Sequence, residues 1–131
     1  MKRTWINVLF YITAFYDGLL GVYFLFFSMS VYDAFGVTRP NHTGYVQFPA
    51  LLLIIFGFMF LRIAREPSQY RELMWYGMGL KAAYSGVVLF HLWFGEGMPS
   101  MWVPFAVIDV AFLILMFLAW KVSGKREPAT A

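Results

Sequence analysis

The chain has 131 residues, of which 61% are hydrophobic and only 13% charged, and its formal net charge is +3. This composition excludes an ordinary water-soluble domain, and the absence of cysteine excludes disulfides, thiolate metal sites and cysteine nucleophiles. The positive charge does not indicate a nucleic-acid partner, because its placement along the chain has a topological explanation. The sequence predicts an all-α, polytopic membrane protein made of one domain.

Four apolar runs are long enough to cross about 30 Å of hydrocarbon at about 1.5 Å per residue. They predict a four-helix transmembrane bundle with helices over residues 5–29, 45–63, 73–94 and 101–121. The first run carries Asp17 and is too long for a signal peptide, so we expect it to be a retained helix. Residues 30–44 are rich in turn formers and predict a loop, and residues 122–131 predict a mobile tail.

The basic residues predict the orientation of this bundle. Most of them flank one side of the four predicted helices: Lys2, Arg3, Arg62, Arg65, Arg71, Lys121, Lys125 and Arg126. The opposite side is flanked by Arg39 alone. Cytoplasmic loops carry the excess of Lys and Arg, so we expect a cell (inner) membrane protein with both termini cytoplasmic.

Three ionisable residues, Asp17, Lys81 and Asp109, each lie deep inside a different apolar run. A charged side chain near the centre of a membrane helix costs roughly 2.5–3.5 kcal/mol, so such residues normally face the bundle interior and often serve function. Counted from the predicted cytoplasmic ends, Lys81 lies about 12 Å deep and both aspartates about 18 Å deep. The lysine stem can span that difference, which predicts an Asp17–Lys81 ion pair.

Helical periodicity groups further polar residues with these charges. The two stripes are Thr13, Asp17, Gly21 and Ser28 on the first helix, and Gly77, Lys81, Tyr84, Ser85 and His91 on the third. We expect the stripes to face each other, with Ala14, Gly18, Ala82 and Gly86 allowing close approach of the backbones. Asp109 is expected to accept a hydrogen bond from Tyr84 or His91.

Two interpretations of this constellation stay open. In the first, the ion pair only fixes helix packing. In the second, the residues Asp17, Lys81, Tyr84, His91 and Asp109 form a ligand-binding site or a proton relay. No metal site is expected, because neither His42 nor His91 belongs to a ligand-spacing motif, and no catalytic residue can be assigned.

The plan of four short spans, a Gly-rich polar first helix and little loop mass resembles the DoxX-like group of small bacterial membrane proteins. Locally, the resemblance lies in the segment Asp17-Gly18-Leu19-Leu20-Gly21-Val22-Tyr23. Some members of that group look like subunits of quinone-linked oxidoreductases. The resemblance therefore implies a membrane partner or a quinone, although no motif in this chain specifies either.

We predict a small membrane subunit or a lipophile-binding module, not an enzyme on its own, acting within a larger membrane complex. Its ligand would have a quinone-like or sterol-like head group, and a quinone is the cofactor that would be compatible with such a site. The expected partners are the lipid bilayer and either other membrane subunits or further copies of the chain. The alternatives are an oligomeric proton-coupled transporter or exchanger, and an intramembrane isomerase that uses the same carboxyl groups.

Overall fold

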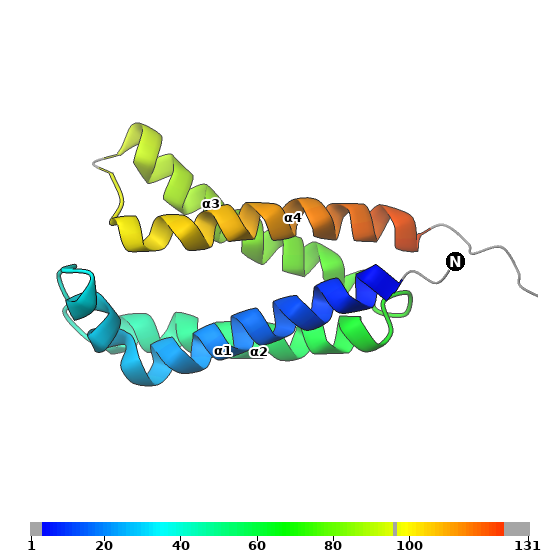
Figure 1. Ribbon diagram of the computed structural model, residues 1–131, viewed down its shortest axis with the longest axis horizontal. Coiled ribbons are helices and arrows are strands. Elements are labelled where there is room, and N and C mark those ends of the chain that lie inside the picture. The colour runs from blue at the N-terminus through cyan, green and yellow to red at the C-terminus, as the bar shows by residue number, and fades with distance from the viewer. Residues whose placement is uncertain (1–3, 96, 125–131) are drawn as a thin grey trace, which may run out of the picture.

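The computed structural model describes residues 4–95 and 97–124, which form an all-helical bundle (Figure 1). The helices are α1 (Thr4–Ala34), α2 (Gly44–Arg65), α3 (Leu73–Phe94) and α4 (Val103–Ser123), with a short 3₁₀ turn, η1 (Ser100–Trp102), leading into α4. The chain folds as two helical hairpins, α1 with α2 and α3 with α4. We call the end of the bundle where α1 begins and α4 ends the basic end, and the opposite end the loop end.

Glycine allows the first hairpin to pack with its two backbones in contact. A Cβ atom on Gly21 of α1 would lie 2.6 Å from the carbonyl oxygen of Ala50 on α2. A Cβ atom on Gly57 of α2 would likewise lie 3.1 Å from the carbonyl oxygen of Ala14 on α1. Ala14 and Gly18 thus permit a close approach as expected, but the neighbour is α2 and not α3. Ala82 and Gly86 do not serve this purpose, because both are exposed on α3.

The two hairpins join through a core near the basic end. Phe60 of α2 is fully buried, and it contacts Phe10 of α1 with ring centroids 6.1 Å apart. A Cβ atom on Gly77 of α3 would lie 2.5 Å from a ring carbon of Phe60, so this phenylalanine fills the space that the glycine leaves. Nearby, the Arg71 side chain donates a hydrogen bond of 2.8 Å to the carbonyl of Trp120 on α4. Toward the loop end, α3 diverges from the rest of the bundle (Figure 1).

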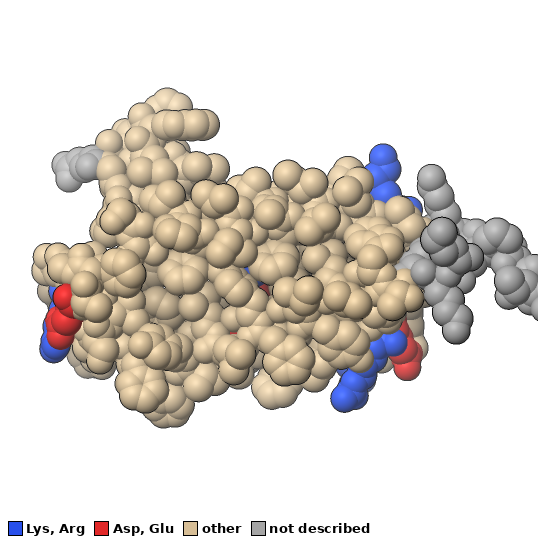
Figure 2. Space-filling model, viewed as in Figure 1, with Lys and Arg blue, Asp and Glu red and all other residues tan. Residues whose placement is uncertain are grey.

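On the face shown in Figure 2, the exposed charged side chains lie at the two ends of the bundle. Many large hydrophobic side chains are exposed along the helices between these ends. Among the described residues, three helical segments are long and apolar enough to cross a membrane: Thr4–Ala34, Gly44–Arg65 and Ser100–Ser123. Four spans were expected, and α3 does not reach the same hydropathy, because it carries Lys81, His91, Ser85 and several glycines. The architecture is nevertheless that of an α-helical membrane protein.

The helix boundaries differ from the expected ones mainly in α1. This helix continues to Ala34, so the first third of the expected 30–44 loop is helical, and a kink at Phe27 (φ −127°, ψ 21°) changes the direction of the helix. Pro49 lies inside α2, where its missing amide hydrogen leaves the carbonyl of Tyr45 without its helical partner. α4 extends to Ser123, two residues into the expected tail, and residues 125–131 lie outside the described residues.

Candidate functional site

The predicted ion pair between Asp17 and Lys81 is confirmed. Lys81 Nζ lies 2.7 Å from Asp17 Oδ1 and 2.8 Å from Asp17 Oδ2, and both side chains are 1% exposed. α1 and α3 have few backbone contacts, so the lysine stem reaches across the space between the hairpins. The pair therefore connects the two hairpins inside the bundle.

Asp109 of α4 is the third member of this cluster. Its Oδ1 atom lies 3.2 Å from Lys81 Nζ, within ion-pair distance but outside hydrogen-bonding geometry. One ammonium thus faces two carboxyl groups that come from opposite hairpins. The prediction that Asp109 accepts a hydrogen bond from Tyr84 or His91 is wrong. The Tyr84 hydroxyl donates to the carbonyl of Trp102 at 3.0 Å instead.

Aromatic rings surround the Lys81 ammonium on its remaining sides. Nζ lies 5.4 Å from the ring centroid of Tyr16, 5.7 Å from that of Phe60 and 5.2 Å from that of Phe112. Rings within about 6 Å of a cation attract it through the negative face of the π system. The rings also give the ammonium apolar surroundings in place of water, in which its interactions with the two carboxyl groups are stronger.

Two hydroxyl groups of the stripes, those of Thr13 and Ser85, form hydrogen bonds within their own helices. Thr13 Oγ1 donates to the carbonyl of Leu9 at 2.9 Å, and Ser85 Oγ donates to the carbonyl of Lys81 at 2.7 Å. Such bonds to the preceding turn are a common way to bury a hydroxyl in a helix. Two buried polar atoms have no hydrogen-bond partner among the described residues: Tyr16 Oη and Asp109 Oδ1.

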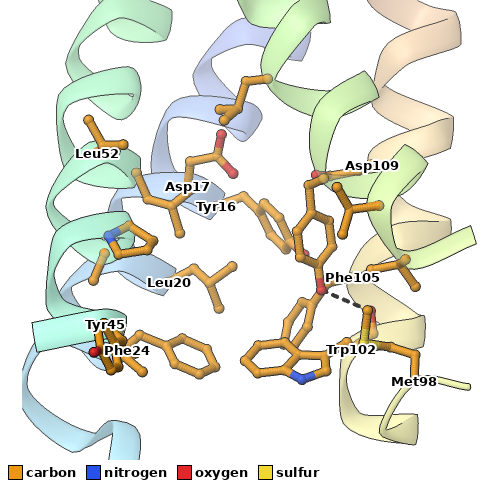
Figure 3. Close-up of a pocket in the computed structure, with 18 of the residues that line it drawn as sticks. Tyr16, Asp17, Leu20, Phe24, Tyr45, Leu52, Met98, Trp102, Phe105 and Asp109 are labelled. Carbon is orange, nitrogen blue, oxygen red and sulfur yellow. Dashed lines mark hydrogen bonds between the residues drawn. The ribbon is translucent and has the colours of Figure 1, made fainter. Parts of the chain in front are cut away.

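A cavity of about 380 Å³ extends from this cluster toward the loop end, between the two hairpins (Figure 3). Asp17, Tyr16 and Asp109 form its polar end. Most of the remaining wall is apolar, with contributions from Leu20, Leu53, Leu80, Val88 and Phe105. A volume of this size lies within the range of small-molecule sites, which is about 300–1,000 Å³.

The cavity opens between α2 and α3. Among the residues that line it, the exposed ones are Tyr45 and Pro49 on α2 and Val87 on α3. At the loop end, the cavity is bounded by Phe24, whose ring stacks on that of Trp102 with centroids 5.7 Å apart. Tyr32, which lies beyond the kink in α1, contacts the same Trp102 edge-on at 5.9 Å. The opening therefore lies on the side of the bundle, in its loop-end half.

Four of the five predicted site residues lie close together in the structure: Asp17, Lys81, Tyr84 and Asp109. Lys81 contacts the two aspartates but does not itself line the cavity. His91 is exposed near the end of α3 and does not line the cavity, because it lies two turns beyond Tyr84 where α3 diverges. Sequence reasoning missed Tyr16 and Trp102. The segment Tyr16-Asp17-Gly18-Leu19-Leu20 resembles the segment Tyr84-Ser85-Gly86-Val87-Val88. Because Tyr84 was predicted to belong to the site, this similarity could have indicated Tyr16 as well.

Within the described ranges, no group of three or more His, Asp or Glu side chains is placed to hold a metal ion. No protein-family model, curated protein or solved structure matches this chain, so no relative indicates its function. The chain can thus be placed by class, as a helical membrane protein with a buried charge cluster at the end of an apolar cavity.

Proposed function

We propose that this protein is a small membrane subunit or module that binds a lipophile in the cavity between its hairpins. The observation that supports this proposal best is the shape and polarity of the cavity. It is apolar over most of its wall and ends at Asp17, Tyr16 and Asp109, so a ligand with a hydrocarbon body and a small polar head would fit it. Sterol-like and quinone-like molecules have this form.

The position of the opening also favours a membrane-dissolved ligand. The exposed rim residues Tyr45, Pro49 and Val87 belong to helix faces that carry apolar side chains along most of their length. A ligand dissolved in the bilayer could enter sideways between α2 and α3 without passing through water. Its polar head would then interact with the charge cluster, and its body would extend toward the lipid.

The proposal includes four membrane spans and two cytoplasmic termini in the cell (inner) membrane. α3 has 22 residues, which gives a length of about 33 Å at about 1.5 Å per residue, and its lysine is paired with two carboxyl groups. Arg62, Arg65, Arg71 and Lys121 all lie at the basic end, as the positive-inside rule requires of a cytoplasmic side.

Reporter fusions would test this topology. We expect alkaline phosphatase to be active when fused after residue 99 and inactive when fused after residue 69, with a fluorescent protein behaving in the opposite way. A fusion after residue 131 should behave like the one after residue 69. The same reporter response at residues 69 and 99 would show that α3 does not cross the membrane.

Binding can be tested with two probes, cholestanol and decylubiquinone, on the full chain reconstituted in nanodiscs. We expect saturable binding of one molecule per chain for at least one probe. Val87→Trp, at the rim of the cavity, should weaken that binding about tenfold or more, because the indole would fill the opening between α2 and α3. Equilibrium dialysis with labelled probe measures the affinity.

Val107→Trp is the matched control, because Val107 is an exposed valine, 64% accessible, on α4 and away from the cavity. This variant should bind like the unsubstituted protein. Absence of saturable binding of both probes to a helical, monodisperse protein would contradict the lipophile proposal.

The relation to a larger complex is a separate part of the proposal, in keeping with the resemblance to DoxX-like proteins. Native mass spectrometry of the protein, extracted under mild conditions, distinguishes the cases. A stable complex with another membrane protein would support the role of a subunit, and a lone chain carrying a lipophile would support an independent module. A homo-oligomer without ligand would favour the alternative, proton-coupled transport.

A further inference from the structure

We infer that the ligand of this cavity carries a hydroxyl group, which donates a hydrogen bond to Asp109 and accepts one from Tyr16. This inference rests on the proposed function and narrows the class of ligand. It favours an alcohol, such as a sterol or a quinol, over a molecule whose polar atoms only accept hydrogen bonds, such as a quinone or a sterol ketone.

The first argument comes from the hydrogen bonds that are already made at the polar end. Lys81 donates to both oxygens of Asp17, so that carboxyl group is occupied. The hydroxyl of Tyr84 donates to the carbonyl of Trp102, and the hydroxyl of Ser85 donates to the carbonyl of Lys81. The donor hydrogens of Tyr84 and Ser85 are therefore in use, and each oxygen of Asp17 already accepts one hydrogen bond.

The second argument comes from the two groups that remain. Asp109 Oδ1 accepts no hydrogen bond, although it lies 3.2 Å from Lys81 Nζ, and the Tyr16 hydroxyl donates none, in the part of the chain that the structure describes. Leaving a buried polar group without a partner is costly, so native structures usually satisfy such groups with water or a ligand. One unpaired acceptor and one unpaired donor match a hydroxyl, which offers one hydrogen and two lone pairs.

The third argument is that both side chains lie beside the same buried ammonium and line the same end of the cavity. Lys81 Nζ lies 3.2 Å from Asp109 Oδ1 and 5.4 Å from the ring centroid of Tyr16. The ring of Tyr16 also contacts Phe112, which lies one turn along α4 from Asp109, at 5.5 Å. Both residues line the cavity, and Figure 3 shows them at its polar end. The two terminal oxygens of an aspartate exchange by a turn about χ2, so either one can face the cavity.

A ketone in the same position would bind less well. Its oxygen could accept the hydrogen of Tyr16, but its lone pairs would also face those of the Asp109 carboxyl group. Buried polar groups that are left unpaired by an incorrect ligand are a strong source of discrimination. The arrangement therefore predicts selection for a hydrogen-bond donor on the ligand.

The test compares cholestanol with cholestanone and with cholestanol methyl ether, which share one apolar body. With the full chain in nanodiscs, we expect cholestanol to bind roughly tenfold more tightly than either of the others. Asp109→Asn should bring the ratio of alcohol to ketone affinity close to one, because the amide can also donate to a ketone. Thermal melting would confirm that this variant is folded.

Two conservative variants complete the test. Tyr16→Phe should weaken the alcohol and the ketone to a similar extent and leave their ratio unchanged, because both ligands accept from its hydroxyl. Tyr76→Phe is the control, and it should alter neither affinity by more than about twofold, because Tyr76 is an exposed tyrosine of α3, 66% accessible, that does not line the cavity.

The outcomes separate this inference from the proposed function. Saturable binding of cholestanol and cholestanone with equal affinity would overturn the requirement for a hydroxyl and leave the lipophile proposal standing. Tighter binding of aminocholestane than of cholestanol would overturn it in favour of a cationic ligand. Absence of binding of every probe, including decylubiquinone, would overturn the inference together with the proposed function.

Discussion

Replacing Lys81 with methionine is expected to destabilise the fold by about 3–5 kcal/mol, because two buried carboxyl groups lose the ammonium that they share. Methionine is similar in length to the lysine stem and can keep most of its packing between the rings of Phe60 and Phe112. The loss of stability therefore reports the missing ammonium charge and not a change in side-chain volume. It would appear as a lower midpoint of unfolding, measured by the circular dichroism of the helices in detergent micelles.

Combined substitutions distinguish a charge effect from a packing effect. Adding Asp17→Asn to Lys81→Met should recover part of the lost stability, and adding Asp109→Asn as a third change should recover more, because each step removes an uncompensated charge. Arg39→Met breaks the exposed pair with Asp33 and is the control, with no measurable change in the midpoint expected. If the triple variant were no more stable than Lys81→Met alone, the charge-based explanation would be wrong.

Replacing Gly21 with alanine is expected to destabilise the protein by about 1–3 kcal/mol, although alanine is the better helix former. The added methyl group would lie 2.6 Å from the carbonyl oxygen of Ala50, which is backbone and cannot move aside without shifting α2. α1 and α2 would then separate along the wall of the cavity to which Ala50 and Leu53 belong. We therefore expect weaker binding of the ligand as well as a lower unfolding midpoint.

Gly18→Ala provides the matched comparison within the same helix. A Cβ atom on Gly18 would meet nothing within 4 Å, so this substitution should be neutral or slightly stabilising. Parallel measurement of unfolding midpoints for the two alanine variants tests the packing directly. Equal effects of both substitutions would contradict the close contact between α1 and α2.

The charge cluster and the cavity are adjacent, and the position of the cluster determines where the cavity begins. The hairpins are joined near the basic end by the core around Phe60, and α3 diverges from the rest of the bundle toward the loop end. The cavity occupies this divergence, and Asp17, Lys81 and Asp109 lie where it begins. The cluster thus holds the hairpins together at the one depth where the apolar core ends and the cavity starts.

Much of the architecture follows from the sequence. The lengths of the apolar runs predicted the helices to within a few residues, except at the end of α1, where residues 30–34 continue the helix beyond the kink at Phe27. The buried stripe of Thr13, Asp17, Gly21 and Ser28 was also predicted, because helical periodicity depends only on local geometry. The Asp17–Lys81 pair followed because few arrangements can bury two opposite charges in an apolar bundle.

The partners of the remaining site residues could not be predicted in this way. Tyr84 and His91 lie on the predicted polar stripe of α3, yet Tyr84 bonds to Trp102 and His91 faces outward. Periodicity places residues on a face of a helix, but it does not say how far that helix tilts from its neighbours. The tilt of α3 decides that Tyr84 reaches the cavity wall and that His91 does not.

The sequence by itself therefore determined the class of the protein, the positions of its helices and the pairing of Asp17 with Lys81, because hydrophobicity, helix period and the cost of burying charge act locally or in pairs. Only the tertiary structure decided which helices touch, that Asp109 also lies beside Lys81, that Ala14 and Gly18 face Gly57, and that Tyr16 and Asp109 line the same end of a cavity. These features depend on the close packing of glycines and rings from all four helices, and no single segment encodes it.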